Sequence, residues 1–91
     1  MGEDSPVVVL CGPTHLPGMT GTKVYQLTID GQPHLVLYRF PERDRSADLS
    51  ITNLYISDHS NELLRVVPRD PTTEQLFQQI TVALLKEVKR R

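Results

Sequence analysis

Cys11 and His15 come closest, by type and spacing, to a reactive site. They lie four residues apart in the stretch CGPTHLPGMTGTK, so an imidazole could act as base to a thiol. Cysteine catalysis also needs a stabilised thiolate and a base held by a third group. Cys11 ends an apolar run, where a free thiol usually behaves as a small buried hydrophobe. We therefore predict a turn-rich loop from residue 12 to 21 and no catalytic role for the pair, although loops of about ten residues are more often functional than shorter ones.

Two other stretches share residue types with known motifs without completing them. GMTGTK resembles part of a phosphate-binding loop, but that motif places GK[ST] between a strand and a helix. Here Thr22-Lys23 reverses the order and leads into a strand-like segment. The run SDHS, residues 57–60, holds the residue types of a hydrolase triad, but triads are assembled from distant segments of the chain. We predict a turn between strands at this run.

The histidines and acidic residues form no recognisable metal-binding or acid–base pattern. A metal site would need at least three of Cys11, His15, His34 and His59 to converge, and the sequence has no HExxH or CxxC motif. The carboxylates lie in or beside predicted turns and alternate with arginines, as on a solvated rim. We predict no catalytic residue, no metal and no cofactor. The acidic residues considered are Asp44, Asp48, Asp58 and Glu62.

Length and composition indicate one small domain, residues 1–91. Of the 91 residues, 38% are hydrophobic and 23% charged, which is ordinary for a folded domain. The formal net charge of −1 gives no overall attraction to nucleic acid or to an anionic membrane. Cys11 is the single cysteine, the first residues are acidic, and no apolar run is long enough to cross a bilayer. These features favour a reducing intracellular compartment, cytoplasmic or nuclear, and no membrane partner.

The elements that position these residues are predicted to be strands followed by one helix. Short β-branched runs and period-2 alternation indicate strands, and turn residues separate them. The predicted fold class is α+β, with an antiparallel β-sheet of about five strands, flat or curved into a half-barrel, and one C-terminal α-helix packed on one face. The strands are expected at about 6–11, 22–30, 33–40, 47–57 and 62–67, and the helix at about 71–90.

The second and third strands are predicted to form a hairpin around Asp30-Gly31, with a loop of two or four residues. Either loop places Tyr25 and Leu27 on one face with the even-numbered residues of the third strand. The third strand is apolar on both faces, as expected for a central strand that is covered on both sides. The opposite face then carries three further apolar side chains, Val24, Leu35 and Leu37.

The fourth strand is predicted to bend. Leu49 and Ile51 share one parity whereas Leu54 and Ile56 share the other, so a regular strand would turn one pair away from the core. A bulge or bend near Thr52-Asn53 would let both pairs face inward.

The C-terminal helix is the best-defined predicted element. Asp70-Pro71 places an N-capping side chain before a proline at the first helical position, and the following residues also fit a capping box. Apolar side chains then recur at i, i+4 and i+8, which forms a stripe able to pack on a sheet. Two apolar residues lie off that stripe, Val82 and Leu85.

One helix covers one face of the sheet, so apolar side chains on the other face need a different cover. Monomeric proteins rarely leave a large contiguous apolar patch bare, and about five strands are few for a closed barrel or sandwich. We therefore predict a protein–protein interaction or assembly module, either a homodimer or a subunit of a larger complex, that binds through the second sheet face and the helix. The predicted contact residues are Val24, Leu35, Leu37, Val82 and Leu85.

The alternative prediction is a module that binds single-stranded nucleic acid. Such proteins combine a basic groove with aromatic side chains on which bases stack. An aromatic content of 5% and the near-neutral charge argue against this function. Its candidate residues are Tyr38, Arg39, Arg43, Arg45 and Arg65.

Overall fold

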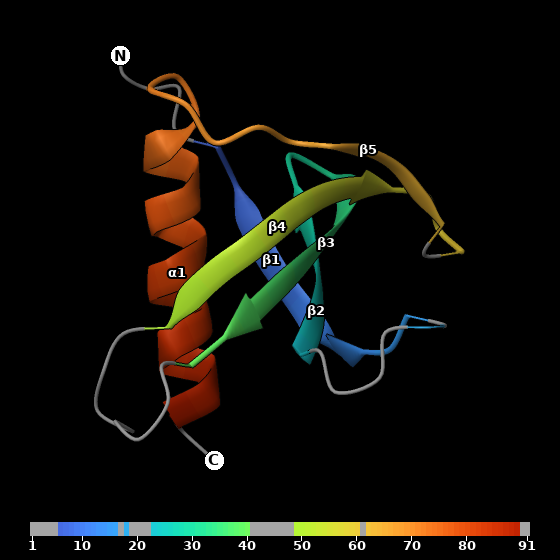
Figure 1. Ribbon diagram of the computed structural model, residues 1–91, viewed down its shortest axis with the longest axis horizontal. Coiled ribbons are helices and arrows are strands. Elements are labelled where there is room, and N and C mark those ends of the chain that lie inside the picture. Colours follow the sequence, from blue (N-terminus) through green and yellow to red (C-terminus); the bar gives the residue numbers. More distant parts are fainter. Residues whose placement is uncertain (1–5, 17, 19–22, 41–48, 61, 90–91) are drawn as a thin grey trace.

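The protein folds into one antiparallel sheet and one helix. The computed structural model describes residues 6–16, 18, 23–40, 49–60 and 62–89. The strands pair in the order β1-β2-β3-β4-β5, each antiparallel to its neighbours, and α1 stands along one side of the strongly twisted sheet (Figure 1). The predicted α+β fold is therefore confirmed. The elements are β1 (Val8–Thr14), β2 (Lys23–Ile29), β3 (Gln32–Arg39), β4 (Ser50–Ser57), β5 (Leu63–Val66) and α1 (Glu74–Lys89).

The β2–β3 hairpin turns on two residues, as one of the two predicted loops requires. Ile29 pairs with Gln32, and the residues between them have positive φ, 54° at Asp30 and 82° at Gly31. Aspartate and glycine tolerate that conformation, and two such residues match the twist of a hairpin. This two-residue turn fixes the hairpin register, in which Tyr25 and Leu27 share one face with Val36 and Tyr38, as predicted.

The predicted bend in β4 is confirmed as a bulge at Thr52. Leu37 pairs with Asn53 and Tyr38 with Ile51, so one residue of β4 has no partner in β3. The extra residue shifts the alternation of side chains by one position. Consequently Ile51, before the bulge, and Leu54, after it, direct their side chains to the same face.

Strand β1 is longer than predicted, and the predicted loop is correspondingly shorter. Its pairing with β2 shifts register between Leu10 and Gly12 and then continues to Thr14, which pairs with Val24. The predicted strand stopped at the Gly-Pro pair, but a proline at the edge of a sheet costs no ladder bond when its nitrogen faces outward. Residues 17 and 19–22 of the predicted loop lie outside the described residues.

Helix α1 begins later than predicted, but the predicted cap is present. The regular helix starts at Glu74, after a turn formed by residues 71–73. Asp70 Oδ1 accepts hydrogen bonds from the N–H groups of Thr72 and Thr73 at 3.0 and 3.1 Å, and the Asp70 N–H donates to Thr73 Oγ1 at 3.0 Å. This reciprocal arrangement is a capping box with Asp70 as the N-cap.

The main core lies between α1 and the side of the sheet that we call the helix face. It holds both aromatic and aliphatic side chains from β2, β3, β4 and α1, and the helix packs closest to β1 and β4. Burying each large apolar side chain contributes about 1.5–3 kcal/mol, so this cluster is the main source of stability. Its buried members are Tyr25, Leu27, Ile29, Val36, Tyr38, Leu49, Ile51, Leu54, Phe77, Ile80 and Leu84.

Candidate interaction surface

The outer face of the sheet, opposite α1, carries a second apolar cluster that the chain covers by itself. Val24, Leu35 and Leu37 are 3%, 0% and 5% exposed. The expectation that these three side chains require a partner is therefore wrong. Their cover comes from side chains of other segments, which the alternation of residues in one hairpin does not reveal. The cluster is completed by Leu16, Tyr55 and Leu63.

Of the two predicted contact residues on α1, one is exposed. Leu85 is half-buried and packs against the main core, whereas Val82 is 53% exposed. Val82 borders a shallow hollow on the outer side of α1, which is otherwise lined mainly by glutamines and Lys86. A single exposed valine among polar residues is ordinary for a protein surface. The helix alone therefore offers little apolar contact area.

Among the described residues, the other large exposed apolar side chains lie on or beside the two outer strands of the sheet. Because the strand order is β1-β2-β3-β4-β5, β1 and β5 are the two edges. These residues were not among the predicted contacts, because an apolar run does not indicate whether its strand will lie at the centre or at an edge of the sheet. They are Val7 and Val9, which are 62% and 52% exposed, and Leu64 and Val66, which are 57% and 49% exposed.

The β1 edge has several features that protect edge strands from further pairing. A register shift after Leu10 distorts the strand, and Pro13 lacks an N–H donor. Val7 is tied to the β2–β3 turn, since Asp30 N donates to Val7 O at 2.9 Å and Val7 N donates to Asp30 Oδ1 at 3.0 Å. On the helix side, Gln79 Nε2 donates to Pro6 O at 3.0 Å. The start of β1 is therefore engaged from two directions.

The β5 edge is the more open of the two. Figure 1 shows β5 well away from α1, with the chain returning from its end to the start of the helix. Val67 N donates to Leu54 O at 2.8 Å, so the backbone N–H of Val67 points toward β4. Backbone groups alternate sides along a strand, so the N–H and C=O of Val66 point to the unpaired edge. An exposed apolar side chain and an available backbone therefore coincide at Val66.

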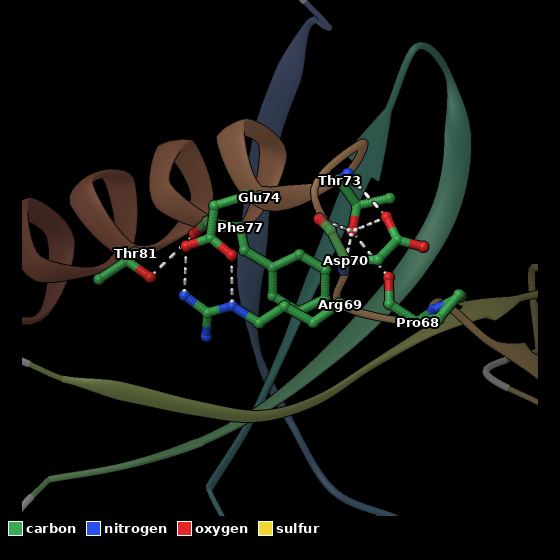
Figure 2. A network of polar contacts seen from close by, with 7 residues as sticks. All are labelled: Pro68, Arg69, Asp70, Thr73, Glu74, Phe77 and Thr81. Carbon is green, nitrogen blue, oxygen red and sulfur yellow. Dashed lines mark hydrogen bonds and ion pairs between the residues drawn. The ribbon is translucent and has the colours of Figure 1, made fainter.

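Polar contacts hold the segment that joins β5 to α1. The Thr73 hydroxyl donates to Pro68 O at 2.7 Å, beside the cap formed by Asp70 (Figure 2). Figure 2 also shows Arg69 bridging to Glu74 through two hydrogen bonds, at 3.1 Å from Nε and 3.0 Å from Nη2. The same guanidinium lies 5.1 Å from the centre of the Phe77 ring, in a cation–π contact. The C-terminal end of β5 is thus fixed relative to the helix.

These contacts also shift the titration of the groups involved. Hydrogen bonds from Thr72 and then Thr73 lower the pKa of Asp70, and the hydrogen bond from Arg69 lowers the pKa of Glu74. The hydrogen bond to Glu74 in turn raises the pKa of Arg69. Since both carboxylates have lowered pKa values in the folded state, their contribution is present above the unfolded pKa of about 4 and is lost as pH falls further.

The nucleic-acid alternative loses its stacking residue. Tyr38 is buried in the main core and its ring packs edge-to-face on Phe40, so the expectation that it lines an exposed surface is wrong. Arg39 ends β3, opposite Ser50 at the start of β4. Arg65 on β5 pairs with Ile56, which lies about 20 Å further along β4. Arg43 and Arg45 lie outside the described residues.

The predicted turn is confirmed after Ser57, which itself ends β4, and this serine is unsuited to nucleophilic chemistry. Asp58 Oδ1 accepts the N–H groups of Ser60 and Glu62 at 2.8 and 2.9 Å. Ser57 Oγ is buried without a hydrogen-bond partner among the described residues, so no base activates it there. Cys11 is exposed. Within the described ranges, no three His, Cys, Asp or Glu side chains gather into a metal-binding group.

His34 is a buried titratable group on the helix face, and it makes stability depend on pH. Its Nδ1 lies 2.7 Å from Gln32 O, and burial lowers the pKa of the imidazole, outweighing the opposing effect of that hydrogen bond. The unfolded chain therefore binds a proton at higher pH than the folded chain. We expect the free energy of unfolding to fall as pH drops from 7 through the unfolded pKa of about 6.5, down to the folded pKa.

Urea unfolding of wild type and His34→Gln at pH values from 7 to 5 measures this effect. Glutamine can still donate to Gln32 O but does not titrate, so the variant is expected to lose that part of the pH dependence. Asp70 and Glu74 titrate lower and are present in both proteins. Equal slopes for the two proteins would show that His34 does not contribute.

Comparison of the chain with protein-family models, with curated proteins and with solved structures found no significant match. In the part of the chain that the structure describes, no helix is both long and apolar enough to span a membrane.

Proposed function

We propose that the protein is a small protein-interaction or assembly module that binds its partner at the β5 edge. The observation that supports this proposal most directly is the coincidence, on β5, of two exposed apolar side chains and a strand edge that no described strand pairs with. This surface replaces the central outer face, whose leucines are already covered. The proposal needs no catalytic group.

An exposed apolar strand edge is unfavourable unless a partner covers it. Exposed apolar edge strands promote uncontrolled pairing, and proteins usually blunt them with charge, proline, bulges or covering segments. The β1 edge has these devices, including Pro13 and the contact from Gln79. On β5 the register shift falls at Leu64 and Arg65 supplies a charge, yet Leu64 and Val66 remain 57% and 49% exposed. A partner bound at this edge would bury both side chains.

Affinity capture with matched variants tests the proposal. Leu64→Ser/Val66→Ser removes the apolar contact, whereas Val82→Ser makes the same change at an exposed position on α1. Exposed substitutions of this kind usually change stability by no more than about 0.5 kcal/mol, so both variants should fold. We expect proteins retained by wild type and by Val82→Ser to be lost from the double variant.

Light scattering over a range of concentrations completes this test, because the retained protein can be a second copy of the chain. A wild-type protein that stays monomeric, and that captures the same proteins as the double variant, would rule out the β5 edge as the binding surface. Circular dichroism of all three proteins shows whether a loss of capture reflects loss of the fold.

A further inference from the structure

Resting on the proposed function, we infer that β5 binds by strand addition, and that the added strand is an extended segment of a different protein with a carboxylate opposite Arg65. In this mode main-chain hydrogen bonds supply affinity, and side chains at alternate positions supply specificity. Arg65 adds a charge preference that the exposed apolar residues alone do not provide.

The backbone of β5 shows where the added strand would bond. The hydrogen bond from Val67 N to Leu54 O continues the pairing of β4 and β5 one residue past Val66. The Val66 donor and acceptor are therefore directed outward, away from β4. The segment after them is held by the Thr73–Pro68 hydrogen bond. The edge is thus formed before a partner arrives, which reduces the ordering entropy that binding would cost.

The register across the sheet shows which side chains the added strand would meet. Arg65 pairs with Ile56, which pairs with His34, so Arg65 belongs to a row on the helix face. Val66 pairs with Tyr55, which pairs with Leu35, so it extends the apolar row on the outer face. An added strand would therefore meet a cation on one face and apolar side chains on the other.

Charge selects the residue opposite Arg65. The other arginine near β5, Arg69, is already paired with Glu74 at 3.0 Å. Arg65 is exposed and makes no ion pair with any residue in the described ranges. Opposite charges across a strand pair are favourable and like charges are unfavourable, so a carboxylate fits this position and a cation does not.

The same rule disfavours a second copy of this chain as the partner. β5 reads LLRV and holds no carboxylate, so an antiparallel pair of β5 strands offers Arg65 no opposite charge, and a register centred on Arg65 sets it directly against the Arg65 of the other copy. A pairing centred on Val66 sets Leu64 against Pro68, which has no N–H to donate. Glu62 O already accepts from Asp58 N at 3.1 Å, so its backbone is turned toward β4. A second copy therefore supplies neither the opposite charge nor an unobstructed register centred on Arg65 or Val66.

The decisive variant is Val66→Pro. Because the Val66 N–H points outward, proline removes a donor from the unpaired edge and leaves the bond from Val67 to β4 in place. Val66→Ala is the matched control, since it shortens the same side chain and keeps the N–H. Arg65→Glu tests the charge. Unfolding curves establish that each variant folds.

The probes are two synthetic peptides, one alternating valine with glutamate and one alternating valine with lysine, titrated into isotope-labelled protein and followed by NMR. We expect the glutamate peptide to shift the Arg65 and Val66 amides and to bind about tenfold more tightly than the lysine peptide. Val66→Pro should weaken it about tenfold or more relative to Val66→Ala. Arg65→Glu should reverse the preference between the peptides.

Several results would overturn the inference, and they separate it from the proposed function. Equal binding of both peptides, or of Val66→Pro and Val66→Ala, would exclude strand addition with a carboxylate, while affinity capture that still depends on Leu64 and Val66 would leave the interaction role intact. A wild-type dimer broken by Val66→Pro would identify a second copy as the occupant. Loss of both the peptide effects and the capture effects would remove the proposed function as well.

Discussion

Replacing Leu35 by alanine is expected to lower the free energy of unfolding by about 2–5 kcal/mol. Leu35 is fully buried at the centre of β3, on the outer face, by contacts within one chain. The substitution removes several methyl and methylene groups and leaves a cavity that the surrounding sheet can only partly close. A loss of this size is a large fraction of the total unfolding free energy of about 5–15 kcal/mol that is usual for small domains.

Urea unfolding of Leu35→Ala at two protein concentrations measures this effect. Leu64→Ala is the matched control, because the same change at a side chain that is 57% exposed should cost no more than about 0.5 kcal/mol. A midpoint that rises with protein concentration, or equal costs for the two variants, would mean that a partner and not the chain itself covers Leu35.

Phe77→Ala is the second substitution with a large expected effect, about 3–5 kcal/mol. Phe77 is 3% exposed and anchors the first turn of α1 in the main core, beneath the guanidinium of Arg69. Its backbone also links the cap to the helix, since Phe77 N donates to Thr73 O at 3.0 Å. Loss of the ring would leave the start of α1 without its largest apolar contact.

Phe77→Leu distinguishes apolar volume from the aromatic contact. Leucine keeps most of the buried area and loses the cation–π interaction, which at an exposed arginine is worth about 0.5–1 kcal/mol. We expect it to cost less than half as much as alanine in the same thermal or urea unfolding experiment. Equal losses would show that the ring is needed for more than filling the core.

The local parts of the fold were predictable because each has a local physical cause. Asp30-Gly31 specifies a hairpin through its positive φ angles, the change of parity between Ile51 and Leu54 requires a bulge, and Asp70 caps the helix through its own side chain. Each of these causes acts within a few residues, so the pattern of the chain contains it.

The candidate surface was not predictable to the same degree, because exposure depends on the whole sheet. Alternation correctly placed Leu35 and Leu37 on the outer face, but they are covered by Leu16, Tyr55 and Leu63, whose positions depend on the rest of the sheet. Similarly, Val9 and Val66 belong to apolar runs that resemble buried strands, and they are exposed because their strands are at the edges.

The contact between Gln79 and Pro6 has a consequence for how the molecule assembles. Every strand pairs with its neighbour in the chain, so each pairing step restricts a comparatively short length of polypeptide. The helix is different, because its hydrogen bond to Pro6 spans 73 residues and joins the first described residue to the last element of the fold. Docking of α1 is thus the step that turns a series of adjoining hairpins into a single cooperative unit.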